Sequence, residues 1–233
     1  MSMFQDLTFP EVLQDLQCRF LINIPDEELM SPERIFFQIE QAHWYYEDFV
    51  REANPAMATM SLKLFSAHMF WNCELLQRLI VDFRSSFRDF VYYKVRVPVC
   101  GAIILSSDHR KCLLVRGFKA GSNWGFPKGK INKEEAEHRC AAREVLEETG
   151  FDIASRLNPD HYLERTIREQ RIRLYVIQGV PEDAHFQTQT RKEIGAIRWF
   201  PLTNLPGWSS KTVEGQPGRP KPSANNFYMV TPF

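Results

Sequence analysis

Three glutamates, Glu144, Glu147 and Glu148, have the residue type and the spacing to bind a metal ion. Positions i, i+3 and i+4 share one face of an α-helix, because successive residues are rotated by about 100°. Like charges on neighbouring turns destabilise a helix by roughly 0.2–0.5 kcal/mol per pair, and acids are least favourable near a helix C-terminus. A divalent cation that prefers oxygen ligands, Mg²⁺ or Mn²⁺, would reverse this repulsion. The alternative is an ordinary solvated acidic face in which Arg143 pairs with Glu147.

The helix that would carry these glutamates has sequence signals at both ends. Asn132 and Glu135 have the spacing of a capping box, which predicts that the helix begins at Asn132. Gly150 follows Thr149 at the position where a left-handed residue commonly ends a helix. The sequence therefore predicts that the three carboxylates lie in the last two turns of a single helix.

The stretch from Gly129 to Phe151 resembles the Nudix box at every defined position. It has, in order, Gly, five residues, Glu, seven residues, Arg-Glu, an aliphatic residue, any residue, Glu-Glu, any residue, Gly and an apolar residue. The resemblance implies an α/β/α-sandwich Nudix domain that hydrolyses a nucleoside diphosphate linked to another group. It also implies that the three glutamates hold Mg²⁺ or Mn²⁺, while Glu135 and Arg143 orient the metal-binding helix.

Three segments outside the box, Gln38–Phe49, Trp124–Lys130 and Tyr228–Phe233, resemble the branch of the Nudix family that removes the 5′ cap of mRNA. This resemblance implies that water attacks on the β-phosphate side and releases 7-methyl-GDP and RNA with a 5′-monophosphate, which initiates mRNA decay. It implies capped mRNA as the substrate and a decapping activator subunit (subunit 1 of the decapping enzyme) docked at the helical domain. Enhancers of decapping are further implied partners, and the implied location is the cytoplasm, including P-bodies.

Two other functions fit the same box. A Nudix hydrolase that acts on a small dinucleoside polyphosphate or a diphosphoinositol would carry the same residues. An RNA-binding or scaffold module with an inactive box is the non-enzymatic alternative. The intact glutamates argue against it, because a repulsive stripe has no physical role without a cation. A preference for free dinucleotide over capped RNA would favour the small substrate.

Trp44 and Asp48 are four residues apart in one predicted helix, so they can present a ring and a carboxylate together. A methylated guanine is a flat cation that stacks on an aromatic ring beside an acid. The resemblance implies that this pair binds the cap and that Tyr228 supplies a second aromatic ring. On spacing alone, Trp44 is more typical of helix packing, and Tyr228 of an aromatic that packs the last element onto its domain.

Other charged residues have implied roles in catalysis and in RNA binding. By resemblance, Glu193 is a general base or an additional metal ligand, and Lys128 and Lys130 add positive charge along the phosphates. Without the resemblance, Glu193 is more simply a surface acid beside Arg191 and Lys192. RNA binding is expected to be electrostatic and to weaken steeply with salt, although each basic residue alone is more simply a solvated charge. The candidate RNA-binding residues are Lys130, Arg165, Arg168, Arg171, Arg173, Arg191, Lys192, Lys211, Arg219 and Lys221.

The composition is that of a globular chain with two differently charged halves. Of its 233 residues, 44% are hydrophobic and 25% charged, which excludes wholesale disorder. No apolar run approaches the roughly 20 residues that span a bilayer, so no membrane partner is expected. Residues 1–97 carry 9 Lys and Arg against 14 Asp and Glu, and residues 98–233 carry 20 against 15. The five cysteines lack metal-ligand spacing and are expected to be reduced thiols of an intracellular protein.

The predicted fold class is α+β, with an all-α regulatory domain over residues 1–94, a hinge at 95–98 and a Nudix catalytic domain over 99–233. The last domain would include the start of a C-terminal RNA-binding element. Helical patterns cover Pro10–Phe20, Ser61–Phe70 and Leu75–Tyr93, and a further helix begins at Ser31-Pro32-Glu33. Strand patterns follow at Val99–Leu105, Cys112–Gly117, Ile172–Val180 and Ile194–Phe200.

Overall fold

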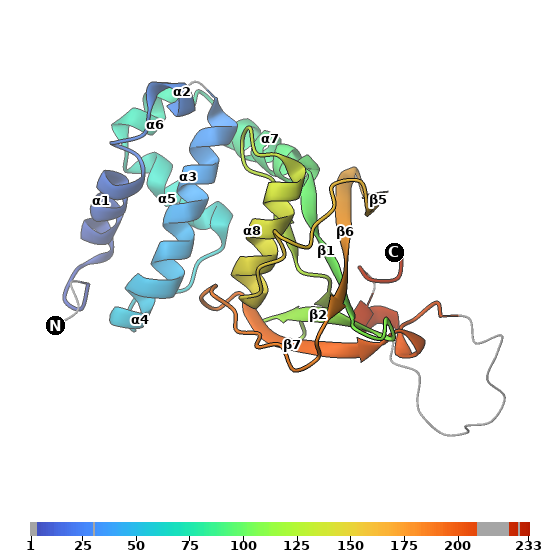
Figure 1. Cartoon of the computed structure of the whole chain (residues 1–233). Coiled ribbons are helices and arrows are strands. Elements are labelled where there is room, and N and C mark those ends of the chain that lie inside the picture. Colours follow the sequence, from blue (N-terminus) through green and yellow to red (C-terminus); the bar gives the residue numbers. More distant parts are fainter. Residues whose placement is uncertain (1–3, 30, 209–223, 228) are drawn as a thin grey trace. The chain divides into compact units, whose positions relative to one another are not determined.

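The computed structural model describes residues 4–29, 31–208, 224–227 and 229–233 (Figure 1). The chain divides into two compact units, Met1–Val95 and Arg96–Phe233. The first is helical and the second is built on a mixed sheet, which confirms the expected α+β class. Among the described residues, no helix has both the length and the apolar character needed to cross a membrane.

The helical unit is organised around the stripe of apolar residues that the sequence places on its third helix. Ile35, Ile39, Ala42 and Tyr46 are all fully buried, as their helical spacing predicts. Pro32 is the first residue of this helix and Ser31 precedes it in extended conformation. The elements are α1 (Phe9–Phe20), α2 (Asp26–Leu29), α3 (Pro32–Tyr45), a π-helical turn (Tyr46–Val50), α4 (Arg51–Ala53), α5 (Leu62–Trp71), α6 (Glu74–Leu79) and α7 (Phe83–Arg96).

The single helix predicted over Leu75–Tyr93 is wrong, because the chain forms α6 and α7 with a break at Ile80–Asp82. Ile80 leaves the helix in extended conformation and is almost fully buried, which places Val81 in solvent with 99% exposure. The Asp82 carboxylate then accepts a hydrogen bond from the N–H of Arg84 at 2.9 Å and starts α7. Helix α7 continues to Arg96, so it includes the first residues of the segment predicted as a hinge.

Most of the aromatic residues of the helical unit pack against one another. Phe36 is fully buried and its ring stacks on that of Phe90, with the centroids 5.3 Å apart. Tyr45 stacks on Phe49 at 4.9 Å, and only Phe49 of these four is substantially exposed, at 42%. Aromatic pairs in such geometries are favourable beyond the area that they bury. These aromatic residues therefore belong mainly to the core of the helical unit.

The second unit is a seven-stranded mixed sheet with the central order β3-β2-β1-β6-β5, in which β4 pairs with β1 and β7 pairs with β2. Strands β1 and β6 are parallel, and the other pairs are antiparallel. The strands are β1 (Val99–Ser106), β2 (Lys111–Gly117), β3 (Trp124–Gly125), β4 (Lys128–Lys130), β5 (Tyr162–Ile167), β6 (Gln170–Val180) and β7 (Ile194–Pro201). The four predicted strands correspond to β1, β2, β6 and β7.

Strand β5 was not predicted, because its hairpin lacks the usual turn residues. The two residues between β5 and β6, Arg168 and Glu169, both have positive φ angles, of 47° and 68°. Two-residue hairpin turns normally use Asn or Gly at such positions. Because Arg168 and Glu169 occupy the turn instead, the sequence carries no turn signal for this hairpin.

The sheet separates two hydrophobic cores. Alternate residues of β1 face opposite sides: Cys100 and Ala102 belong to the core beneath helix α8 (Glu137–Thr149), whereas Val99 and Ile103 belong to the other. Figure 1 shows α8 beside β1 on one side of the sheet. In the described residues the opposite core is closed by short 3₁₀ turns, Leu202–Asn204 and Ala224–Phe227, and by the chain end, rather than by a second long helix.

Candidate active site

Helix α8 carries the three glutamates, but it begins later than predicted. Its first residue is Glu137 and not Asn132, and it ends at Thr149 with Gly150 in left-handed conformation (φ 71°) as expected. Glu134 has a φ of 60°, which interrupts any helix between Asn132 and Ala136. The N–H of Asn132 still donates to the Glu135 carboxylate at 2.9 Å, so half of the predicted capping box forms without a helix around it.

Glu135 holds the guanidinium of Arg143 in two parallel bonds. Arg143 donates through Nε and Nη2 to the two carboxylate oxygens of Glu135 at 2.8 and 2.9 Å, and through Nη2 to the carbonyl of Lys130 at 3.1 Å. The hydrogen bond from Arg143 lowers the pKa of Glu135, and the same pair raises the pKa of Arg143. These bonds join the loop before α8 to the middle of the helix.

Arg143 also contacts two of the candidate metal ligands. Its Nη1 lies 2.7 Å from Glu144 Oε1 and 3.5 Å from Glu147 Oε2. Glu144 additionally packs over the α-carbon of Gly129, where a Cβ atom would overlap its carboxylate. Glycine at this position therefore gives the Glu144 side chain the space that it occupies.

Glu148 is the most enclosed of the three glutamates, with 8% of the residue exposed. Its Oε2 accepts a hydrogen bond from the backbone N–H of Lys128 at 3.0 Å. Burial raises the pKa of Glu148 to about 8, and burial also lowers the pKa of the Lys128 ammonium. The opposite charges of Glu148 and Lys128 and the hydrogen bond between them favour the charged forms, but burial outweighs both effects.

Glu193 shares the electrostatic environment of α8. Burial raises the pKa of Glu193, and the negative charge of Glu147 raises it further. The pKa of Glu144 is likewise raised, first by burial and then by Glu147 and Glu193, against the opposing effect of Arg143. The structure thus brings the four predicted carboxylates into one interacting set, beside Lys128.

The donor set fits a hard divalent cation, which Nudix hydrolases generally need, but the side chains are not arranged as a finished site. In the described part of the chain, no three His, Cys, Asp or Glu side chains converge closely enough to hold a metal ion. Arg143 and the Lys128 N–H instead hold the carboxylates apart. The pKa values of Glu144 and Glu148 are raised although Arg143 and Lys128 act to lower them, so the site has an excess of buried acid that a divalent ion would compensate.

Two of the three predicted cap-binding residues, Trp44 and Asp48, lie in the helical unit. Trp44 is 51% exposed on α3, so it is not a core residue. Asp48 is half-buried in the π-helical turn that follows α3, one turn beyond Trp44. Tyr228 lies outside the described residues, as do Lys211, Arg219 and Lys221.

The remaining RNA-binding candidates fall into two groups. Arg171 and Arg173 both pair with Glu137 and Glu164, so their charges are compensated within the protein. Arg165 is exposed on β5, and its Nη1 donates to the neighbouring carbonyl of Glu164. The others occupy strand β4 (Lys130), the β5–β6 turn (Arg168) and the segment before β7 (Arg191 and Lys192).

One exposed aromatic residue beside the carboxylates was not predicted. Phe118 is 60% exposed, and its N–H donates to the carbonyl of Glu193 at 2.7 Å. The sequence signal for it was Arg116-Gly117-Phe118-Lys119, an aromatic residue between two cations.

Comparison with known proteins matches both units to family models. The model described as "Dcp2, box A domain" matches residues 11–93, and the NUDIX domain model matches residues 95–220. The chain is 48% identical over 230 residues to the mRNA decapping complex subunit 2 of Schizosaccharomyces pombe, covering 99% of this chain and 30% of that protein. It is 46% identical over 224 residues to the mRNA-decapping enzyme subunit 2 of Arabidopsis thaliana, covering 96% and 58%. The m7GpppN-mRNA hydrolase of Saccharomyces cerevisiae (strain S288c) is 38% identical over 202 residues, covering 87% and 20%. The chain thus spans between about one fifth and three fifths of these relatives.

Proposed function

We propose, from the premise that this chain belongs to the Nudix family, that it hydrolyses the 5′ cap of mRNA. The products would be 7-methyl-GDP and RNA with a 5′-monophosphate, and the reaction would initiate mRNA decay. One observation carries the proposal. Burial and neighbouring acids raise the pKa values of Glu144, Glu148 and Glu193, which form one set with Glu147 in a chain whose two units match a box A and a Nudix domain. The relatives that align with 99% and 96% of this chain are named "mRNA decapping complex subunit 2" and "mRNA-decapping enzyme subunit 2".

In the proposed reaction, Glu144, Glu147 and Glu148 hold Mg²⁺ or Mn²⁺, with Glu193 as base or additional ligand. A bound divalent ion would neutralise charge on the phosphates and stabilise the leaving oxygen. As base, Glu193 would accept the proton of the attacking water, a role suited to a carboxyl whose pKa is raised by burial. Burial lowers the pKa of Lys128, and a phosphate bound beside it would favour its charged form.

The other assigned residues complete the proposal. Trp44, exposed on its helix, would stack on the methylated guanine, with Asp48 compensating its charge and Tyr228 adding a second ring. Lys130, Arg165, Arg191 and Lys192 would bind RNA phosphates. The division into a regulatory domain (1–94), a hinge (95–98) and a catalytic domain (99–233) is part of the same proposal, and proteolysis should cut first at the hinge.

The test uses RNA carrying a radiolabelled cap, incubated with the chain and Mg²⁺ or Mn²⁺. Labelled 7-methyl-GDP and 5′-monophosphate RNA should appear, and Glu148→Gln should abolish both. Release of label from free dinucleotide or diphosphoinositol in preference to capped RNA would replace this function with a small-substrate one. No metal-dependent cleavage of either substrate would exclude both.

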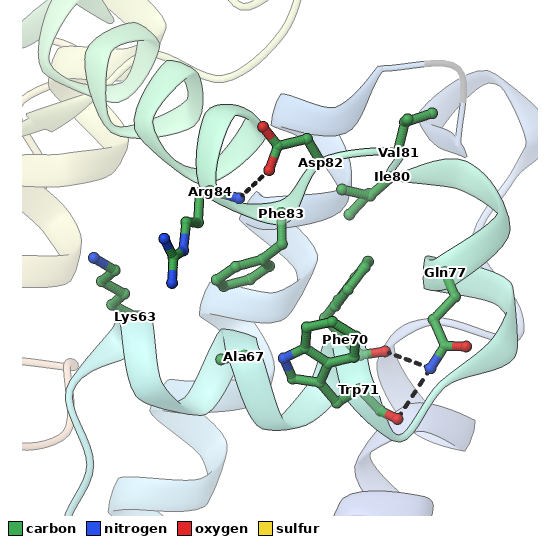
Figure 2. Close-up of a pocket in the computed structure, with 10 residues that line it drawn as sticks. All are labelled: Lys63, Ala67, Phe70, Trp71, Gln77, Ile80, Val81, Asp82, Phe83 and Arg84. Atoms are coloured by element: carbon green, nitrogen blue, oxygen red, sulfur yellow. Dashed lines mark hydrogen bonds between the residues drawn. The ribbon is translucent and has the colours of Figure 1, made fainter.

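We further propose that a decapping activator subunit docks at a pocket of the helical unit, of about 790 Å³ (Figure 2). Trp71 is 68% exposed there, and Figure 2 shows Lys63 and Arg84 on the same side of the Phe83 ring. Neither cation forms an ion pair with any residue that the structure describes. An apolar wall beside two uncompensated cations is complementary to a segment that carries a large apolar residue next to an acid.

This docking site is tested by measuring the affinity of the activator subunit for the chain. The double charge reversal Lys63→Glu/Arg84→Glu should weaken binding at least tenfold. The control is the charge reversal Arg78→Glu at an exposed residue of α6 that does not line the pocket. Equal affinity for all variants would place the activator elsewhere. Enhancers of decapping and a cytoplasmic location that includes P-bodies are proposed with the function, and imaging the tagged chain with P-body markers tests the location.

A further inference from the structure

A second hollow lies in the Nudix unit, where the loop after β2 passes over the start of β7. Its volume is about 380 Å³, within the range of small-ligand sites. Three of its seven lining residues are glycines, so backbone forms much of its surface and a flat ligand can approach closely. The lining residues are Arg116, Gly117, Phe118, Lys119, Ala120, Gly121 and Gly195.

Phe118 presents an aromatic face on a fixed backbone. It is 60% exposed, and no other ring in the described part of the chain contacts it. Its N–H bonds to the Glu193 carbonyl at 2.7 Å, and a Cβ on Gly195 would approach its Cα within 2.9 Å. The main chain at Phe118 is therefore held in place while its ring remains open to solvent, which suits a stacking surface.

Two cations flank this ring. The Arg116 guanidinium lies over the Trp124 ring, 5.1 Å from its centroid, and Lys119 is exposed on the loop. Neither forms an ion pair with a residue that the structure describes. An aromatic face between uncompensated cations is the combination that binds a nucleotide, with the base on the ring and the phosphate on the cations.

The hollow lies beside the main chain of the segment that carries Glu193. Gly117 pairs with Ile194 across the β2–β7 ladder, and the Glu193 carbonyl accepts a hydrogen bond from the N–H of Phe118 at 2.7 Å. A ligand in the hollow is thus one residue away from Glu193. With the phosphates of a capped RNA at the carboxylates, the first nucleotide of the RNA would have the hollow beside Glu193 as a nearby binding surface.

We propose that this hollow binds the first nucleotide after the triphosphate bridge, with its base stacked on Phe118 and its phosphate against Arg116 and Lys119. The proposal rests on the proposed cap hydrolysis and adds a contact on the RNA side of the scissile bond. It makes Phe118 a substrate-binding residue for RNA, not for the methylated guanine.

The test compares kcat/KM on two capped RNAs, one with a normal first nucleotide and one with an abasic first nucleotide. Phe118→Ala should lower kcat/KM on the normal RNA about tenfold, chiefly through KM, because base–aromatic stacking has about this worth. For the unsubstituted chain, kcat/KM should be about tenfold lower on the abasic RNA than on the normal RNA. On the abasic RNA, Phe118→Ala should cause no further loss of kcat/KM. Phe118→Trp should restore cleavage of the normal RNA, and Trp208→Ala, an exposed aromatic outside the hollow, should have no effect.

The outcomes separate this inference from the function on which it rests. If the unsubstituted chain does not cleave capped RNA, the proposed function fails. Two results with an active unsubstituted chain would refute only the hollow. One is a Phe118→Ala variant with unchanged kcat/KM on normal RNA, and the other is a variant whose kcat/KM falls by the same factor on normal and on abasic RNA. As an independent measurement, Lys119→Ala should reduce the slope of log affinity against log salt by about one for capped RNA, and an unchanged slope would remove the phosphate contact.

Discussion

Two clusters of arginine and glutamate in the Nudix unit use the same residue types and differ in balance and burial. In the first, Arg171 and Arg173 each pair with Glu137 and Glu164, so two positive charges meet two negative ones. In the second, Arg143 is the only arginine of the described residues that pairs with Glu135, Glu144 and Glu147, and two further glutamates, Glu148 and Glu193, lie nearby.

The pKa values express this difference. In the balanced cluster, burial acts to raise the pKa of Glu164, but the bonds from Arg173 and Arg171 outweigh it and the pKa is lowered. At α8, burial wins, and the pKa values of Glu144, Glu148 and Glu193 are all raised. Glutamate–arginine pairing alone does not mark a site. A functional site is instead indicated by an excess of buried acidic groups over the cations that the protein places beside them.

The largest expected effect comes from Glu148→Gln. Loss of a proposed metal ligand should lower cap hydrolysis by more than about a hundredfold, since even groups that only orient ligands are worth 10- to 100-fold. In the absence of metal the same change should leave the free energy of unfolding unchanged or raised, because burial already disfavours the charged form of Glu148. Activity and chemical denaturation measured on one preparation test both parts.

Glu164→Gln is the matched control from the balanced cluster. It should keep full activity and lose some stability, which is the opposite pattern. If Glu148→Gln and Glu164→Gln behaved alike, the distinction between the two clusters would be wrong.

Gly129→Ala is expected to have the next largest effect. Its Cβ would overlap the Glu144 carboxylate and displace it from Arg143, so activity should fall about tenfold or more. Overpacking should also cost roughly 1–3 kcal/mol of unfolding free energy. Gly125→Ala is the comparison, because its Cβ would make only an ordinary contact with Lys128 Nζ at 3.6 Å. Equal activities for both variants would show that Gly129 does not position Glu144.

Much of this site could be predicted from the sequence, because a helix fixes the relation of residues within it. The spacing of Glu144, Glu147 and Glu148, and the left-handed Gly150, are local features, and α8 has them as expected. The helix start was misplaced because the Asn132–Glu135 bond is local, whereas the φ of Glu134 depends on the fold around Arg143.

Contacts across the fold could not be predicted in the same way. Phe118 meets Glu193 only because β2 pairs with β7, 75 residues later in the chain. Arg171 and Arg173 looked like RNA-binding residues because their partner Glu137 comes from another element, α8. The break at Ile80–Asp82 depends on burial of one isoleucine, which periodicity does not reveal.

A smaller effect is expected for Arg171→Gln. Its partners are partly exposed, so the unfolding free energy should fall by no more than about 1 kcal/mol. The salt dependence of RNA binding should not change, since this charge is already compensated inside the protein, in contrast to Lys119→Ala. A reduced salt slope for Arg171→Gln would return this arginine to the RNA-binding surface.

The smallest expected effect is a pH dependence of the balanced cluster. Because the pKa of Glu164 is lowered in the folded chain, its contribution to stability is present above the pKa of about 4.3 that an unfolded glutamate has. That contribution is lost as the pH falls through the lower folded pKa, where the folded carboxyl also takes up its proton. The stability difference between the unsubstituted chain and Glu164→Gln should therefore be constant from pH 7 to pH 5 and shrink toward zero below pH about 4, as measured by urea denaturation. A difference that grew on acidification would mean that burial, as at α8, controls Glu164 as well, and the two clusters would no longer be distinct.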